Sequence, residues 1–528
     1  FLRSLVASLG ASLHPDELTF VLVDYKGGSA FDVCARLPHT VGLVTDLDGH
    51  LAQRALTCLE AELRYREERL RVVGAADLPA YRDSGAQEPL PRLFVVVDEF
   101  AALAKELPEF MASLIDVAQR GRSLGVHLLL ATQRPQGVIN DQIRANTNLR
   151  IALRVQDPAD SVDVLGVRTA AAIGRAQAGR GYVRLGAGDV QGFQAALVTG
   201  PATGMPDPEL VPFVFAAEQP RPTPPQVEGD QTTDLDVLVD AVFGAFEQAG
   251  AAAPRRPWLE PLRPDLVTAD LPAPPGTGVA LGLADEPSLQ RQRVATWQPA
   301  DGNLLLYGVA GSGTSTALVT LAVGLAEAYL PDDLHLYALD FDDQRLAPLE
   351  ALGHCGGIVG PADRERQVRL IRMLQKEIDS RRGLVASDPA ALAGLPTIVL
   401  LLDNYGGFAA AFDEPSDLGV KSALARVVAD GPGVGVVSIV AAKQPVDVPA
   451  QVSSLIPAKL LFKLADRYEY AGQGLAGVEP PSVPGRCYES WTGREMQIAR
   501  AHADGTAAAV ALMDRHLAID RPVPVVGV

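Results

Sequence analysis

Residues 303–316 have the sequence NLLLYGVAGSGTST and decide the fold of the second half of the chain. A short apolar run ends at Tyr307, a glycine-rich stretch starts at Gly308, and an apolar helical pattern follows Thr316. This order predicts a strand, a tight turn and a helix. It matches the phosphate-loop pattern G-x-x-x-x-G-K-[ST] everywhere except at Thr314, which stands where lysine is expected.

A glycine-rich loop of this kind holds phosphate through its backbone N–H groups, and the helix that follows adds its dipole. Ser315 would complete the coordination of Mg²⁺, but the lysine that neutralises the β- and γ-phosphates is replaced. We therefore expect ATP binding with weak or no hydrolysis; a turn kept only for packing is the alternative. The expected nucleotide-binding residues are Gly308, Gly311, Ser312, Gly313, Thr314, Ser315 and Thr316, with Ser315 also a metal ligand.

The two halves of the chain repeat one another in order, at an offset of about 305 to 316 positions. Chance similarity would not keep this order over most of both halves. The matched segments are Pro15–Asp24 with Pro331–Asp340, Leu63–Arg66 with Ile378–Arg381, Leu90–Glu99 with Leu395–Asn404, Ala131–Pro135 with Ala441–Pro445, and Gly179–Tyr182 with Gly485–Tyr488.

Each half alternates short apolar runs with amphipathic helical stretches, as in FVLV at 20–23 and LFVVV at 93–97. Such runs are typical of strands buried on both faces of a parallel sheet, with helices as right-handed crossovers. We expect an α/β fold made of tandem P-loop NTPase domains with mostly parallel sheets flanked by helices. The expected divisions are a first domain at 1–216, a Pro- and acid-rich linker at 217–257 with a short helix near Leu235–Phe246, and a second, degenerate domain at 258–528.

Two acids, Asp98 and Glu99, end the apolar run LFVVV. In phosphoryl-transfer sites the first such acid holds Mg²⁺ through water and the second polarises the attacking water. Because ligands bind at the carboxyl ends of parallel strands, we expect Asp98 to bind metal and Glu99 to act as the catalytic base; a plain polar strand end is the alternative. In the second half Asp403 occupies the position of the first acid, and we expect it to be part of the nucleotide-binding site. Asn404 replaces the base, so that site is expected to be catalytically silent.

Two further polar residues follow strands of the first half. Gln133 ends the run HLLLATQ and is a candidate for orienting water or sensing the γ-phosphate, or for a local hydrogen bond. Its counterpart Lys443 is a further departure of the second half. Lys26 follows the first strand in DYKGG and would reach phosphate, unless the segment is a plain glycine turn.

Arg120 and Arg122 end the helical stretch after the two acids. An arginine finger needs a planar, permanently charged donor presented to a neighbour's γ-phosphate. Arg122 is the first candidate for this role and Arg120 the second; a solvated helix end is the alternative. The second half has Asp430-Gly-Pro there and could supply no finger.

The repeat aligns Phe1 with Ala317, just after the phosphate loop of the second half. The lysine and serine of a first loop would then precede Phe1. We therefore expect that the first domain is truncated at its Walker A motif, and that the chain has little activity alone.

The composition excludes several classes of protein. Lys and Arg number 46 against 64 Asp and Glu, and a net charge of −18 argues against a broad nucleic-acid footprint, although a local basic patch stays open. The four cysteines have no short paired spacing, which favours reduced thiols over a disulfide framework or zinc site. No secretory signal is visible, and no uncharged apolar stretch approaches about 18 residues. A membrane segment ahead of Phe1 stays open.

Together these residues resemble the FtsK/SpoIIIE branch of P-loop motor ATPases. The resemblance covers nearly all of residues 1–216 and rests on VDYKGGSAF, VVVDEFAAL, QRGRSLGVHLLLATQRP and RANTNLRIALRV with its following DPADS. In the second half WLEPL, GLADEPSLQRQ and GVAGSGTST are similar to later ATPase modules of type VII secretion coupling proteins, the EccC/EssC group. The resemblance implies RecA/FtsK-like domains, with ATP and Mg²⁺ as cofactors.

In that group the first module hydrolyses ATP, and later degenerate modules bind nucleotide or secreted-protein signals. The relatives act as hexameric rings at the membrane, anchored by N-terminal helices. The resemblance therefore implies a homo-oligomer made of the cytoplasmic domains of a membrane-anchored bacterial protein. Its function would be a motor for protein secretion. The first alternative is an FtsK-type translocase of double-stranded DNA, for chromosome segregation or DNA transfer, with basic pore loops on the phosphates. The second alternative is a scaffold that does not hydrolyse ATP.

The acidic charge, the unequal tandem domains and the lack of a separate basic DNA-reading domain in the sequence favour secretion over DNA translocation. Charge is the weakest of the three arguments, because a ring pore can be basic on an acidic protein.

Overall fold

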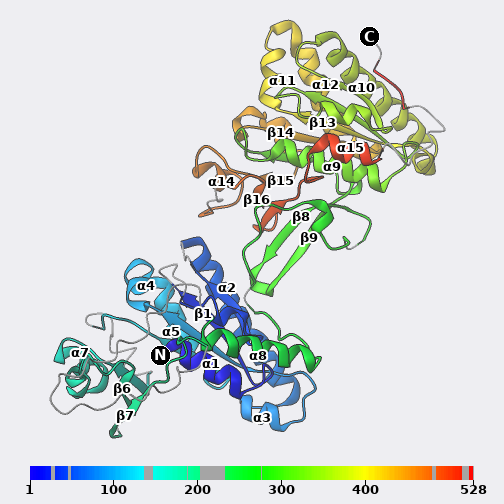
Figure 1. Cartoon of the computed structure of the whole chain (residues 1–528). Helices are drawn as coiled ribbons and strands as arrows, with labels where there is room; N and C mark the ends of the chain where they lie inside the picture. The colour runs from blue at the N-terminus through cyan, green and yellow to red at the C-terminus, as the bar shows by residue number, and fades with distance from the viewer. Residues whose placement is uncertain are drawn as a thin grey trace, which may run out of the picture. The chain divides into compact units, whose positions relative to one another are not determined.

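A computed structural model describes residues 1–24, 30–45, 49–135, 147–186, 188–202, 232–257, 259–274, 276–478, 483–513 and 523–526. The chain divides into two compact units. Unit 1 contains Phe1–Glu260 and the short segment Pro287–Gln290, and unit 2 contains Pro261–Glu286 and Arg291–Val528. Figure 1 labels their helices and strands.

Unit 1 is built on a parallel sheet with the strand order β2-β1-β3-β4. Its strands are β1 (Leu18–Asp24), β2 (Thr40–Val44), β3 (Arg92–Asp98) and β4 (Val126–Leu130). Its helices are α1 (Leu2–Ser12), α2 (Gly49–Val73), α3 (Leu78–Asp83), α4 (Phe100–Glu106) and α5 (Pro108–Gly121).

The two faces of this sheet bury alternate residues of its central strands. Val21 and Val23 of β1 belong to the core that α2 and α5 cover, whereas Phe20 and Leu22 belong to a second core with α1. The apolar runs are therefore buried on both faces, as a parallel sheet between helices requires.

Two further parts complete unit 1. An antiparallel sheet of β5 (Leu149–Leu153), β6 (Arg180–Leu185) and β7 (Val190–Gln194) packs a small core with α7 (Pro158–Leu165). The helix expected near Leu235–Phe246 is α8 (Asp234–Gln248), which begins with a capping box between Thr233 and Asp236. Its buried Leu235 and Val239 join the core that contains α1, so α8 packs as part of unit 1.

Unit 2 contains a ten-stranded sheet in the order β12-β11-β13-β14-β10-β15-β16-β17-β8-β9. The run from β12 to β15 is parallel, and the strands from β16 to β9 are antiparallel. The strands are β8 (Val279–Glu286), β9 (Arg291–Trp297), β10 (Leu304–Tyr307), β11 (Leu334–Asp340), β12 (Cys355–Val359), β13 (Thr397–Asp403), β14 (Val436–Ala442), β15 (Ala458–Leu461), β16 (Arg486–Glu489) and β17 (Glu495–Ile498).

Helices cover both faces of the parallel part (Figure 1). They are α9 (Thr314–Ala328), α10 (Arg364–Ser387), α11 (Tyr405–Ala411), α12 (Leu418–Asp430), α13 (Ala450–Ser453), α14 (Tyr468–Gly472) and α15 (Thr506–Met513). Strand β13 alternates in the same way as β1, because Leu400 and Leu402 pack on the α10 and α12 side and Val399 and Leu401 on the α9 side. The predicted class, tandem α/β domains with mostly parallel sheets flanked by helices, is confirmed.

A buried arginine marks the repeat inside both units. Arg66 on α2 donates to the Leu124 carbonyl oxygen at 2.9 Å, two residues before β4. Arg381 on α10 donates to the Val434 carbonyl oxygen at 3.1 Å, two residues before β14. Each arginine also pairs with a glutamate one turn earlier on its own helix. The two long helices thus dock on their sheets through the same polar contact.

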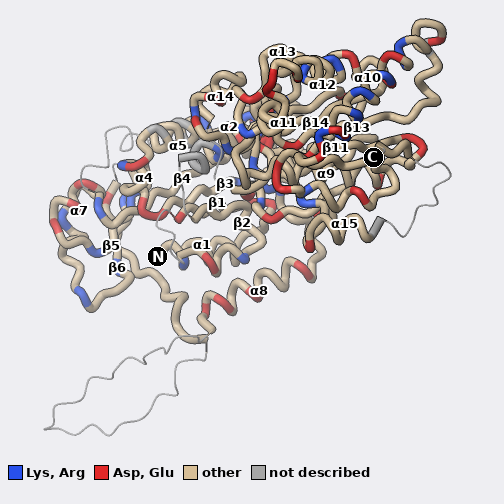
Figure 2. The backbone as a smooth tube through the Cα atoms, turned by 90° about the horizontal axis from the view of Figure 1, so that it is seen from above, with Lys and Arg blue, Asp and Glu red and all other residues tan. Residues whose placement is uncertain are grey.

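Charges of both signs are interspersed along the backbone, and α8 carries acidic residues (Figure 2). All four cysteines are free thiols. Among the described residues, no helix combines the length and the apolar character that crossing a membrane needs.

Candidate functional site

The glycine-rich loop of unit 2 joins β10 to α9, as predicted from residues 303–316. The Gly308 N–H donates to the Ala442 carbonyl oxygen at 3.0 Å, which ties the start of the loop to the end of β14. A Cβ atom on Gly308 would lie 2.3 Å from Ser312 Oγ and 2.7 Å from Phe462 Cβ. Gly313 has φ +112°, and a Cβ there would lie 2.6 Å from the Gly485 nitrogen. The loop therefore depends on these glycines for its shape.

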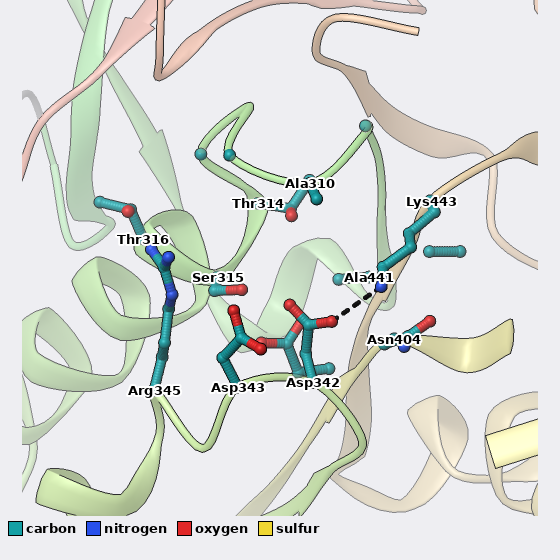
Figure 3. A pocket seen from close by; sticks show the side chains of 15 residues that line it. Ala310, Thr314, Ser315, Thr316, Asp342, Asp343, Arg345, Asn404, Ala441 and Lys443 are labelled. Atoms are coloured by element: carbon teal, nitrogen blue, oxygen red, sulfur yellow. Dashed lines mark ion pairs between the residues drawn. The ribbon is translucent and has the colours of Figure 1, made fainter. Parts of the chain in front are cut away.

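Helix α9 begins at Thr314, so its first N–H groups have no acceptor within the helix and lie in the wall of a pocket. The pocket brings together the loop and the ends of three strands (Figure 3). It is lined by Gly308, Ala310, Gly311, Gly313, Thr314, Ser315, Thr316, Asp342, Asp343, Arg345, Asp403, Asn404, Ala441, Ala442 and Lys443. Six of the seven predicted loop residues line it, and Ser312 packs beneath Gly308.

Asp403 stands at the carboxyl end of β13, opposite Asp340 of β11 in the strand register. Burial raises the pKa of the Asp403 carboxyl to about 6, with smaller contributions from Asp340 and Asp342; a hydrogen bond from Ser315 opposes this shift. Asp403 Oδ2 is buried and has no hydrogen-bond partner among the described residues. A carboxylate oxygen and a hydroxyl placed together fit Mg²⁺ bound with nucleotide phosphates.

The residue after Asp403 is an asparagine with a left-handed backbone conformation. Asn404 has φ +64°, accepts a hydrogen bond from the Gly407 N–H at 3.1 Å and donates to the Phe341 carbonyl oxygen at 3.0 Å. The amide oxygen therefore caps α11, and the amide nitrogen ties this point to the residue after β11. Glu99 in unit 1 has φ +56° at the same point of its own strand and helix.

The acids of unit 1 lie together at the end of β3. Asp98 lies opposite Asp24 in the register with β1, and the Glu99 N–H donates to Asp98 Oδ1 at 3.0 Å. Glu99 is buried, and the Thr132 hydroxyl donates to its Oε1 at 3.1 Å. Thr132 lies two residues after the end of β4, so the ends of two neighbouring strands position the carboxylate.

Thr132 was not among the predicted site residues. The sequence signal that could have found it is its place between β4 and Gln133, because residues after neighbouring parallel strands share one edge of the sheet. In unit 2 the lining residues Asp342, Asp343 and Arg345 were missed in the same way. They follow β11, the strand that pairs with β13.

The structure places the other predicted site residues that it describes at two separate places in unit 1. Gln133 is exposed beside Thr132 at the edge that holds Glu99. Arg120 lies in the last turn of α5 and Arg122 caps its end; both are exposed. Lys26 lies outside the described residues.

The end of α5 is at the opposite edge of the sheet from the two acids. A Cβ on Gly121 of α5 would lie 2.7 Å from Val126 Cβ at the start of β4, and Val126 pairs with Leu93 at the start of β3. The arginines are therefore separated from the acids of their own unit by the length of β3. An arginine finger from this position would have to act on a neighbouring molecule.

A sequence model of the FtsK/SpoIIIE family matches residues 1–186 and 278–393, in both units. The ESX secretion system protein EccC of Geobacillus thermodenitrificans is 32% identical over 521 residues, which cover 92% of this chain and 34% of that protein. The chain therefore spans about a third of the length of this relative.

Solved structures of type VII secretion ATPases are among those similar to this chain. The cytoplasmic domain of the Thermomonospora curvata type VII secretion ATPase EccC matches with a TM-score of 0.83 and 26% identity, over 100% of this chain and 63% of that one. Thermomonospora curvata EccC, ATPases 2 and 3, in complex with a signal sequence peptide, matches with a TM-score of 0.58 and 21% identity, over 95% of this chain and 86% of that one. At 21% identity, the second match shows a similar fold alone.

Proposed function

Because the chain belongs to the FtsK/SpoIIIE family of ATPases, we propose that it is the tandem motor part of a type VII-like protein secretion system. Residues 1–216 form the module that hydrolyses ATP, residues 217–257 join the modules, and residues 258–528 form a second module that binds nucleotide and regulates the first. In the repeat, Phe1 aligns with Ala317, which directly follows the phosphate loop of the second module.

The observation that carries this proposal is the contrast between Glu99 and Asn404. Both residues have the same left-handed backbone conformation directly after an aspartate that ends a central strand. Glu99 offers a carboxylate that can accept the proton of an attacking water, whereas an amide cannot. The Asn404 side chain instead caps the following helix through Gly407 and contacts the Phe341 carbonyl oxygen after β11.

The first module would use its residues in distinct roles. Asp98 holds Mg²⁺ through water, and Glu99, oriented by the Thr132 hydroxyl, polarises the water that attacks the γ-phosphate. Gln133 at the same edge orients that water. Arg122, or Arg120, stabilises the transferred phosphoryl group on the neighbouring subunit of a ring.

In the second module the loop and Ser315 would hold ATP and Mg²⁺ with Asp403, and no residue serves as base. A bound but intact nucleotide suits a regulatory module, since it fixes the conformation of the loop without turnover. Secreted proteins as substrates, a hexameric ring and a membrane anchor are part of the proposal. The names of similar proteins, type VII secretion ATPases among them, support it.

Double-stranded DNA translocation is the second candidate, because the same family fold serves it. The net charge of −18 and the interspersed charges of Figure 2 favour the secretion function, since a DNA motor contacts phosphates with basic residues.

The experiment that tests the proposal measures ATP turnover by the chain joined to its own upstream residues. The rate is measured alone, with duplex DNA, and with C-terminal peptides of small secreted helical-hairpin proteins. Stimulation by peptide, or a low basal rate that DNA leaves unchanged, supports secretion. Stimulation by DNA that weakens steeply as salt rises would replace it with the translocase.

A further inference from the structure

Thr314 leaves the phosphate loop of unit 2 without its own cation, but a lysine on the neighbouring strand lies in the same pocket. Strand β14 pairs with β10, with Ala442 opposite Tyr307. The Gly308 N–H then donates to the Ala442 carbonyl oxygen. Strand β14 ends at Ala442 and Lys443 is the residue that follows it, so the register places Lys443 beside the start of the loop.

The side chain of Lys443 is turned into the pocket. Its Nζ lies 2.9 Å from Asp342 Oδ1, and both residues line the pocket with Thr314 and Ser315. Figure 3 shows Lys443 and Asp342 pointing toward one another. The lysine side chain is 44% exposed and the aspartate 19%, so the pair lies at the wall of the pocket and incoming solutes can reach it.

The charges around the pocket explain why a lysine is needed there. Asp342, Asp343 and Asp403 line it, and the cations that line it are Arg345 and Lys443. A triphosphate would meet an excess of carboxylates in a loop whose own lysine is replaced. The hydrogen bond that Lys443 donates to Asp342, together with the neighbouring acids, raises the pKa of Lys443 above its ordinary value. The ammonium therefore stays charged at neutral pH.

We propose that Lys443 replaces the loop lysine as the cation that binds the distal phosphates of a nucleoside triphosphate in the second module, and that Asp342 holds it when no nucleotide is bound. This inference rests on the proposed nucleotide binding by that module. Binding exchanges one anionic partner of Lys443 for another, from the Asp342 carboxylate to phosphate oxygens. The lost lysine at position 314 is then compensated from the adjacent strand.

The test measures the affinity of the 528-residue chain for a fluorescent ATP analogue with Mg²⁺. The glycine-rich loop occurs once in these residues, so binding reports on the second module. Lys443→Ala should weaken binding about tenfold or more, as the loss of a charge-assisted contact does. Lys443→Arg should bind like the unmodified chain. Asp342→Asn should tighten binding several-fold, because ATP no longer competes with a carboxylate for the lysine.

A matched control is Lys421→Ala. Lys421 also pairs with an aspartate, Asp413 at 3.3 Å, but does not line the pocket, so its removal should leave the affinity unchanged. The double variant Thr314→Lys/Lys443→Ala returns a cation to the loop and should restore binding. Restoration separates loss of charge from damage to the fold.

The outcomes of this test show separately whether the second module binds nucleotide and whether Lys443 takes part in that binding. If the unmodified chain binds no ATP analogue, nucleotide binding by the second module is wrong and the role of Lys443 is rejected with it. If the chain binds and Lys443→Ala binds equally well, the module keeps its function and the role of Lys443 is wrong. If Lys443→Ala binds poorly and Thr314→Lys does not restore it, Lys443 is a structural residue.

Discussion

Glu99 and Asn404 have the same left-handed backbone conformation, with φ of 56° and 64°, each directly after the aspartate that ends a central strand. Glutamate is uncommon in this conformation, whereas asparagine tolerates it. The proposed role of the carboxylate explains a glutamate in this conformation. The capping of α11 explains an asparagine there. In the proposed function, this pair distinguishes a module with a catalytic base from a module without one.

Removing the hydroxyl that holds Glu99 should slow catalysis. Thr132→Ala deletes the 3.1 Å hydrogen bond to Glu99 Oε1. We expect kcat to fall about tenfold with little change in KM, a typical loss for one hydrogen bond to a charged group. Steady-state ATPase kinetics of the chain joined to its upstream residues would measure this. Thr132→Ser keeps the hydroxyl and should retain most activity; a similar loss in both variants would contradict the role of the hydroxyl.

The phosphate loop should not tolerate a methyl group at its first glycine. In Gly308→Ala the new Cβ would lie within 2.7 Å of both Ser312 Oγ and Phe462 Cβ. We expect loss of nucleotide binding by the second module and a destabilisation of about 1–3 kcal/mol, the usual cost of overpacking. Gly360→Ala is the control, because a Cβ there meets nothing within 4 Å. Equal melting temperatures and equal ATP affinities for the two variants would show that the loop is not packed as described.

Stability should depend on pH through Asp403. Its pKa of about 6 lies above the ordinary value of 3.8, so the folded state binds the proton more tightly than the unfolded state does. The charged carboxylate therefore lowers stability fully above pH 6, and this penalty disappears as the pH falls from about 6 to about 4. Asp403→Asn should raise the free energy of unfolding at pH 8 by about 2–3 kcal/mol.

Denaturant titrations of the Asp403→Asn variant at several pH values would measure this. The gain should shrink as the pH approaches 4, and the variant should bind Mg²⁺ and ATP more weakly, because the ionised oxygen is gone. A gain that is the same at pH 8 and at pH 4 would show that the stabilisation does not come from this titration.

The sequence predicted the strands and the loop because local patterns determine them. The runs at 93–97 and 304–307 are short and apolar, as buried strands are, and glycines mark the turn that follows the second run. The repeat also aligned Arg66 with Arg381, which the structure shows in equivalent contacts on their two helices.

Contacts across strands were harder to predict, because they depend on which strands are neighbours. The pairing of β11 with β13 brings Asp342 and Asp343 into the pocket with Asp403, and the pairing of β14 with β10 brings Lys443 beside the loop. The pattern of a single sequence does not give the order of the strands in the sheet. Lys443 was therefore identified only as the residue that replaces Gln133 in the second half. The antiparallel extension of the unit 2 sheet from β16 to β9 was not foreseen for the same reason.

The central claim is that ATP turnover depends on the base of the first module alone. The most direct measurement is the ATPase rate and ATP affinity of Glu99→Gln in the chain joined to its upstream residues, with Glu60→Gln, an exposed position on α2, as the matched control. Glu99→Gln should lose turnover and keep ATP binding, and the control should keep both. Turnover retained by Glu99→Gln would contradict the division of labour between the two modules.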